Sequence, residues 1–336
     1  MALRFIDSCG DYYSTAQLGR KWTANVSGQI LAGGGRRAGN ALDGSFARSY
    51  SRTIDAQGTW VVGFAYKYAA APASDNQIMI LLDVVTEQVS LRMEASTGKL
   101  KFTRSGTTLG TVSAAALTTG VEHYIEVKAV IHPSAGTYEV RVDGVAVISG
   151  VAQNTRTTAN STADSFRLNT GVSIGACMFD DVYMCDGTGA TLNDFLGDVR
   201  VDAYLPAADG ANSGLTPSTG TSHFALVNEN PANDDTNYNS SATVGAKDTY
   251  DFANMTHTPV SIFGVQVNMT ARKDDAGARS VAAVTRSGGA DYDGATQGLS
   301  TSYTQYQQIV TLDPNTAAAW TKTALNAAEF GVKVAA

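Results

Sequence analysis

The sequence predicts an all-β protein made of two β-sandwiches, and three observations lead to this prediction. The stretch from Val121 to Gly150 has the pattern of three β-strands joined by two turns. Short apolar or alternating stretches bounded by glycine, proline and asparagine recur along the chain, as is typical of strands joined by tight turns. The first 190 residues contain no segment with helical periodicity, so we expect strands alone there.

The central stretch explains why two layers are needed. Residues 124–131 are rich in β-branched and aromatic side chains, and the turn formers His-Pro-Ser-Ala-Gly follow at 132–136. Apolar and charged residues then alternate over 138–142, which places them on opposite faces of a strand. Asp143-Gly144 predicts a two-residue hairpin turn. A meander with one apolar face needs a second sheet to cover it.

The other strands of the first part follow in chain order. Residues 1–24 lead into a first strand. The Gly-Gly-Gly-Arg-Arg-Ala-Gly stretch at 33–39 matches neither the P-loop nor the dinucleotide fingerprint, so it predicts a flexible hairpin loop. Residues 60–68 predict a strand, and 78–85 predict a fully buried strand broken only by Asp83. Further strands are expected at residues 89–94, 100–104, 165–168 and 175–184.

The glycine-rich segment Asp186-Gly187-Thr188-Gly189-Ala190 interrupts the strand pattern. It predicts a first domain at residues 1–190 and a second domain at residues 195–336. Residues 198–205 alternate and predict a strand. The polar stretches 206–220 and 227–244 predict loops around a short strand, and residues 320–328 predict a short helix or turn. The short strand is expected at 223–226, and the remaining strands at 248–253, 261–271, 279–286, 303–312 and 330–334. We expect this part to form a second, smaller β-sandwich.

Composition excludes several classes of protein. A net charge of -7 argues against a nucleic-acid partner, because no basic field offsets the phosphate charge. With 43% hydrophobic and 16% charged residues the chain has enough apolar material for a core, and disorder is not expected. No apolar run is long enough for membrane insertion, and the first residues do not form a secretion signal. Cys9, Cys177 and Cys185 form no disulfide framework; Cys177 and Cys185 pair only if adjacent strands bring them together, and free thiols are favoured.

Two resemblances add to this interpretation. The stretch 60–68, the Val142-Asp143-Gly144-Val145 hairpin and Phe-Asp-Asp-Val-Tyr at 179–183 resemble the concanavalin A-like, laminin-G-like jelly rolls. This implies a concanavalin A-like jelly-roll sandwich over residues 1–190. Three later stretches look like a two-domain type of tailed-bacteriophage virion protein: 195–201, 210–218 and 329–333. That resemblance implies a structural or host-contacting part of a phage particle. The free thiols and the missing secretion signal indicate synthesis in the host cytoplasm.

A search for catalytic patterns identifies no catalytic residue. Glucanases of the jelly-roll fold carry alternating carboxylates on one strand, but the closest pattern here, Glu139-x-Arg141-x-Asp143, has an arginine at the middle position. We expect it to be a solvent-facing charge set. The four histidines have no metal-ligand spacing, and no Gly-x-Ser-x-Gly elbow supports a Ser-His-Asp triad. We therefore expect no enzyme and no organic cofactor.

Calcium is the one ion that the sequence suggests, because hard oxygen ligands are plentiful. Three acidic stretches are candidates: Asp180-Asp181, Asn233-Asp234-Asp235, and the Asp-x-Asp-Gly stretch that begins at Asp291. The predicted ligands are Asp180, Asp181, Asp291 and Asp293. The laminin-G-like resemblance implies a calcium site at the rim of the sandwich. The alternative is that these aspartates are turn residues with local hydrogen bonds. Four tyrosines are candidates for stacking on sugars, with ordinary sheet packing as the alternative: Tyr12, Tyr13, Tyr66 and Tyr68.

The leading hypothesis is a non-enzymatic structural component of a tailed-phage virion, associated with the tail as a collar, tip or short appendage and in contact with host glycan. The alternatives are a capsid decoration protein and, further, a carbohydrate-binding module or a glycan hydrolase. The expected partners are other virion proteins, further copies of this chain and a host surface glycan.

Overall fold

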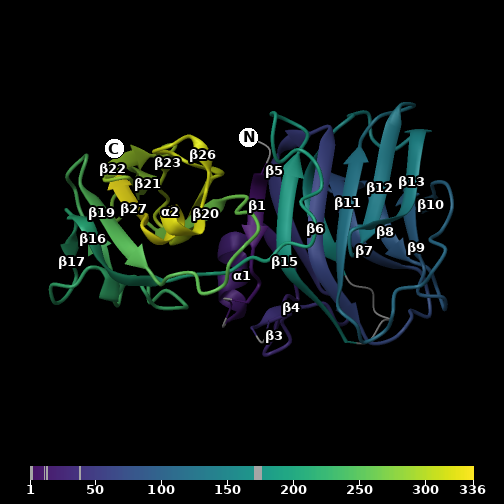
Figure 1. The fold of residues 1–336 in the computed structure, drawn as a ribbon, viewed down its shortest axis with the longest axis horizontal. Coiled ribbons are helices and arrows are strands. Elements are labelled where there is room, and N and C mark those ends of the chain that lie inside the picture. Colours follow the sequence, from purple (N-terminus) through teal and green to yellow (C-terminus); the bar gives the residue numbers. More distant parts are fainter. Residues whose placement is uncertain (1–2, 11, 13, 38, 170–175) are drawn as a thin grey trace. The chain divides into compact units, whose positions relative to one another are not determined.

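The protein divides into two compact units, which we describe separately. The computed structural model describes residues 3–10, 12, 14–37, 39–169 and 176–336. Unit 1 comprises residues Met1–Asp202 and unit 2 comprises Ala203–Ala336. Figure 1 shows that both are built mainly of strands.

Unit 1 is a sandwich of two antiparallel sheets, which confirms the predicted fold class. The eight-stranded sheet has the order β13 (Val145–Gln153), β12 (Gly136–Val142), β11 (His123–Val130), β6 (Thr59–Tyr68), β15 (Cys177–Asp186), β4 (Ala41–Asp43), β3 (Ile30–Leu31), with β1 (Leu3–Asp7) paired to β15. The seven-stranded sheet has the order β10 (Thr107–Thr108), β9 (Leu100–Arg104), β8 (Thr86–Met93), β7 (Asn76–Asp83), β14 (Ala163–Asn169), β5 (Ser49–Gln57), β2 (Ala24–Val26).

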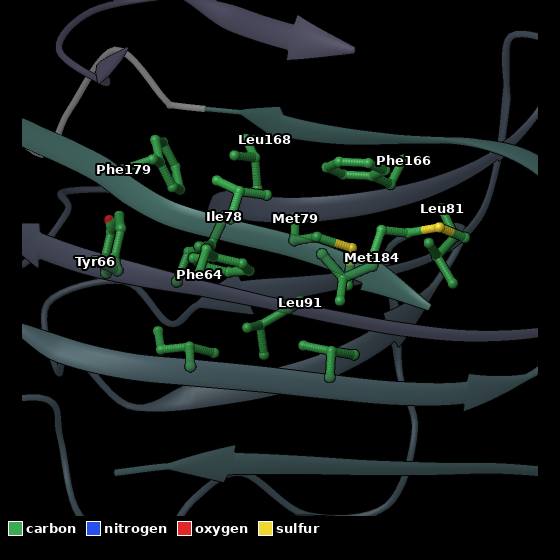
Figure 2. Close-up of a cluster of buried hydrophobic side chains, with 14 of the residues drawn as sticks. Phe64, Tyr66, Ile78, Met79, Leu81, Leu91, Phe166, Leu168, Phe179 and Met184 are labelled. Atoms are coloured by element: carbon green, nitrogen blue, oxygen red, sulfur yellow. The ribbon is translucent and has the colours of Figure 1, made fainter. Parts of the chain in front are cut away.

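The core of unit 1 lies between these two sheets, and it forms because apolar residues recur at every second position of the facing strands. Figure 2 shows Phe64 and Phe179 of the larger sheet close to side chains of the smaller sheet. The rings of Trp60 and Phe166, which belong to opposite sheets, have centroids 6.4 Å apart. Large aromatic contacts of this kind bridge the layers and hold them together.

The central meander is confirmed as β11, β12 and β13. Asp143 and Gly144 both have positive φ, at 50° and 79°. A two-residue hairpin turn needs positive φ at both positions to match the twist of the strands that it joins. The fully buried strand is also confirmed, as β7, although Val84 and Val85 lie beyond it in an exposed turn. The loop at 33–39 joins β3 to its antiparallel partner β4, so the predicted hairpin loop is correct.

One helix in unit 1 was not expected. The prediction that residues 1–190 contain strands alone is wrong, because α1 spans Thr15–Lys21. Seven residues make two turns, which is too short for a hydrophobic period to show in the sequence. A capping box between Ser14 and Gln17 begins the helix locally.

The predicted strand at 198–205 is also wrong, and the reason concerns hydrogen bonding. The chain here is irregular, and its N–H groups donate to side chains of unit 1 instead of to a neighbouring strand. Gly197 N donates to Glu126 Oε1 at 2.8 Å, and Val201 N donates to Asp181 Oδ1 at 2.8 Å. These bonds keep the segment with unit 1, so the division falls at Asp202, later than the expected break at 186–190.

Unit 2 is smaller and also all-β. Its six-stranded sheet has the order β16 (Pro206–Ser213), β19 (Lys247–Phe252), β27 (Glu329–Val334), β21 (Ser280–Ser287), β22 (Ala290–Asp293), with β23 (Gln297–Gly298) paired to β21. A two-stranded layer of β20 (Val265–Ala271) and β24 (Thr304–Val310) packs its Val267 and Met269 in one cluster with Phe330. The smaller elements are β17 (Thr216–Pro217) with β18 (Asn239–Ser240), β25 (Leu312–Asp313) with β26 (Ala318–Ala319), η1 (Phe224–Leu226) and α2 (Lys322–Asn326).

Two predictions for unit 2 need correction. Residues 206–220, expected as a loop, contain β16 and β17, and the strand expected at 223–226 is the 3-10 helix η1. The edge strand β16 has two register shifts against β19, so its sequence lacks regular alternation. The helix or turn expected at 320–328 is confirmed by α2. In the described residues no helix has the length and apolar character that crossing a membrane requires.

Candidate functional site

The candidate site is the outer face of the seven-stranded sheet, the side turned away from the core. Direct cross-strand partners align Ser51, Arg167, Ile80, Ser90 and Thr103 in one row across five strands. Residues directly opposite one another project from the same side of a sheet, so the whole row shares one face. The neighbouring residues on these strands point the other way, into the core: Tyr50, Phe166, Leu81, Leu91 and Phe102.

Two further rows flank the first, in the same register. One row contains Gln77, Arg92 and Lys101, and the other contains Thr53, Ser165, Leu82 and Glu87. We call the residues of the three rows the polar face.

A connected hydrogen-bond network holds the centre of the polar face in place. Arg92 Nε donates to Ser90 Oγ at 3.0 Å and to Thr103 Oγ1 at 3.1 Å. Arg92 Nη2 donates to Glu87 Oε2 at 3.0 Å, and Gln77 Nε2 donates to the same oxygen at 2.6 Å. Ser90 and Thr103 are fully buried, so they form a floor beneath the longer side chains. The guanidinium, carboxylate and amide are therefore fixed in orientation before any ligand arrives.

Arg167 occupies a second position on the polar face. Its Nε donates to Ser51 Oγ at 3.0 Å, and its row neighbour on the other side is Ile80, which is buried. No carboxylate in the described part of the chain forms an ion pair with Arg167. By contrast, Arg92 pairs with Glu87, and Lys101 pairs with Asp75. On the polar face, Arg92 and Lys101 are therefore neutralised by carboxylates, whereas Arg167 has no ion-pair partner among the described residues.

The outer face of the eight-stranded sheet differs, because another segment of the chain covers part of it. The guanidinium of Arg141 lies 4.0 Å from the ring centroid of Phe195, and Leu196 N donates to Tyr183 OH at 3.1 Å. Lys128 Nζ forms an ion pair with Asp194. Segment 193–201 therefore lies on that face. By contrast, every hydrogen bond that Arg92 and Arg167 make among the described residues stays within the polar face.

Asp180 and Asp181, two of the predicted calcium ligands, lie buried at a bulge of β15 and are bonded to arginines. Arg36 N donates to Asp180 Oδ2 at 2.7 Å, and both Arg36 and Arg37 form ion pairs with Asp181. Burial, opposed by the bond from Arg36 N, raises the pKa of Asp180 to about 7. The sequence did not indicate that the arginines of the glycine-rich loop would reach these carboxyls.

Asp291 and Asp293, the other two candidates, lie on β22 of unit 2 and are likewise paired with cations. Arg286 Nη1 is 2.8 Å from Asp291, and Lys247 Nζ is 2.8 Å from Asp293. Burial opposes the shift, but hydrogen bonds from neighbouring side chains hold the pKa of both carboxyls below its ordinary value. The four candidates lie in two different units, and no group of three potential ligands gathers anywhere in the described residues. Calcium binding stays a prediction. Asp181, Asp291 and Asp293 pair with cations, whereas Asp180 accepts hydrogen bonds from the backbone N–H groups of Arg36 and Asp181.

The remaining sequence candidates have structural roles. Tyr12, Tyr66 and Tyr68 are buried, so they pack in the core, and Tyr13 lies outside the described residues. Arg141 Nε donates to Glu139 Oε1 at 2.6 Å, which confirms a surface charge set, whereas Asp143 bonds His123. All three cysteines are free and buried, as was favoured.

Comparison with known proteins gives no family. No protein-family model matches the chain, and no curated protein matches it. Among solved structures it is similar to the cellulose-induced protein Cip1, at 12% identity and a TM-score of 0.42, over 54% of this chain and 96% of that one. It is also similar to a mutant of the alginate lyase Aly36B in complex with an alginate tetrasaccharide, at 10% identity and a TM-score of 0.40, over 54% of this chain and 95% of that one.

A Trypanosoma rangeli sialidase is similar over 46% of this chain and 26% of its own, at 9% identity and a TM-score of 0.35. These proteins have concanavalin A-like jelly rolls. The likeness concerns the fold alone, and none of the structures named here is a phage protein.

Proposed function

We propose that this protein is a non-enzymatic binding protein whose polar face contacts an extended glycan. The observation that supports this most is the arrangement of Arg92, Glu87 and Gln77 over a floor of buried hydroxyls. Guanidinium, carboxylate and amide groups each present two adjacent polar atoms, which suits the adjacent hydroxyls of a sugar ring. Because the side chains are already fixed, little further conformational entropy is lost when a ligand binds.

The carboxylates at the polar face are arranged for binding a ligand and not for catalysis. Cleavage of a glycosidic bond commonly needs two carboxyl groups, one to donate a proton and one to act as nucleophile or base. Glu87 bonds Arg92, Gln77 and Ser90, and Asp75 pairs with Lys101. The hydrogen bond from Lys101 lowers the pKa of Asp75, which makes that carboxyl a poor proton donor.

We propose further that the protein acts on the particle of a tailed phage, at the tail or alternatively on the head, together with other virion proteins and copies of itself. Support comes from the resemblance of segments 195–201, 210–218 and 329–333 to such proteins. The edge strand β13 is also uncharged, with Val145 and Val151 exposed, which suits pairing between copies.

The glycan proposal is tested by affinity electrophoresis of the full chain through gels containing neutral and acidic polysaccharides. Wild type should be retarded by at least one of them. Arg92→Lys keeps the positive charge but loses the planar guanidinium with its paired N–H donors. We expect its affinity for the polysaccharide to fall about tenfold, because one charge-assisted hydrogen bond is lost. Arg141→Lys is the matched control, because Arg141 also pairs with a glutamate but lies on the face covered by segment 193–201.

Equal losses in Arg92→Lys and Arg141→Lys would show that the polar face is not the site. Failure of wild type to bind any polysaccharide would reject the glycan function itself.

A further inference from the structure

We infer that the glycan bound by the polar face is acidic, and that Arg167 recognises its negative charge. This inference rests on the proposed function and adds the class of ligand. The first observation is the difference between the two arginines of the face. Glu87 neutralises Arg92, whereas Arg167 has no ion-pair partner within the described residues and donates only to the uncharged Ser51.

The immediate surroundings of Arg167 also lack negative charge. Its direct cross-strand partners are Ser51 and Ile80. The adjacent row contains Thr53, Ser165 and Leu82, and then Glu87 on the more distant strand β8. Glu87 is the acid of that row, and it bonds Arg92. Asp164, on the same strand as Arg167, accepts a hydrogen bond from Val84 N.

The way in which Arg167 is held defines what it can bind. Its Nε is bound to Ser51 Oγ at 3.0 Å, which fixes the plane of the guanidinium and leaves both terminal nitrogens for a ligand. Two terminal N–H groups side by side match the two oxygens of a carboxylate or of a sulfate. Ile80, which is 3% exposed, provides an apolar surface beside the charge and lowers the competition from water. Uronic acids and sulfated sugars both fit this chemistry.

The test compares ligands that differ in charge alone, by isothermal titration calorimetry of the full chain. The probes are hexagalacturonate and its full methyl ester, and dextran sulfate and dextran. We expect wild type to bind the charged member of at least one pair about tenfold more tightly, with an advantage that decreases as sodium chloride is added. A preference within the first pair identifies a carboxylate, and within the second pair a sulfate.

The variants assign this preference to one residue. Arg167→Gln should remove the preference for charge, so that the charged and the neutral probe of a pair bind with similar affinity. Arg167→Lys, which retains the charge and much of the packing, should keep part of the preference. Arg279→Gln removes the same charge from an exposed salt bridge of unit 2 and should change nothing.

Two results would overturn the inference, and they differ from each other. If wild type binds charged and neutral probes equally, or if Arg167→Gln keeps the preference, Arg167 is not the recognition residue although the glycan function stands. If wild type binds neither these probes nor any polysaccharide in the electrophoresis assay, the glycan function fails and the inference fails with it.

Discussion

At the scale of single residues, buried carboxylates with several partners organise unit 1. Asp7 is fully buried and accepts hydrogen bonds from Tyr12 OH at 2.6 Å, Trp22 Nε1 at 2.8 Å and Lys21 Nζ at 3.0 Å. These bonds tie α1 and the residues around it to β1. A buried charge is stable only when it is satisfied in this way, so removing a partner costs more than the bond itself contributes.

Asp180 gives a prediction about pH. Its pKa is raised from an ordinary 3.8 to about 7, so the folded protein holds a proton on Asp180 that the unfolded chain releases. The stabilising contribution is fully present below about pH 4 and is lost as pH rises through 7. Relative to Asp180→Asn, wild type should lose up to about 1.4 kcal/mol of unfolding free energy per pH unit in this window.

Urea unfolding of both proteins between pH 4 and 8 measures this difference. Asp275→Asn serves as control, because Asp275 is exposed and its hydrogen bond with Arg279 lowers its pKa. Its curve should run parallel to wild type from pH 5 to 8. Parallel curves for Asp180→Asn and wild type would mean that Asp180 stays ionised in the folded state.

At the scale of secondary-structure elements, the pairing of the neighbouring strands β6 and β15 depends on a glycine. Gly63 and Tyr183 are direct cross-strand partners, and the Tyr183 ring lies over the space where a side chain at 63 would project. This position lets Tyr183 OH reach Glu126 Oε1, which in turn accepts Gly197 N. The glycine therefore helps to hold segment 193–201 on the outer face.

We expect Gly63→Ala to destabilise the protein by about 1–3 kcal/mol, because the added methyl group overlaps the ring of Tyr183. Thermal unfolding followed by circular dichroism measures the effect. Gly298→Ala is the matched control, since Gly298 also lies in a strand but has open space around its missing side chain. A similar melting temperature for Gly63→Ala and Gly298→Ala would refute the steric argument.

At the scale of the whole molecule, each unit has a hydrophobic cluster of its own. The cluster of unit 1 includes Phe64 and Phe166, and the cluster of unit 2 includes Trp320 and Phe330. The polar face and the edge strand β13 both belong to unit 1.

The location on a particle is a prediction of its own, tested by immunogold electron microscopy of phage particles with antibodies to this chain. Label on the tail is the expected result and would support host contact. Label on the head would favour the decoration alternative. Protein found free in the lysate, with intact particles unlabelled, would contradict the virion proposal.

What the sequence determined by itself was local. Alternation with a period of two predicted the strands of the meander, and Asp143-Gly144 predicted its turn, because side-chain direction and turn conformation depend on neighbouring residues alone. The same reasoning failed at α1, which is too short to show a period, and at β16, where bulges interrupt the alternation.

Tertiary structure alone decided the candidate site. Arg92 and Arg167 belong to strands far apart in the sequence, and only the register of β8, β7 and β14 brings them onto one face. The pair of Arg92 and Glu87 forms within β8, whereas the bond from Arg36 N to the buried Asp180 joins segments far apart in the sequence. Strand pairing and desolvation are long-range properties, so residue patterns along the chain predict the strands but not which side chains they bring together.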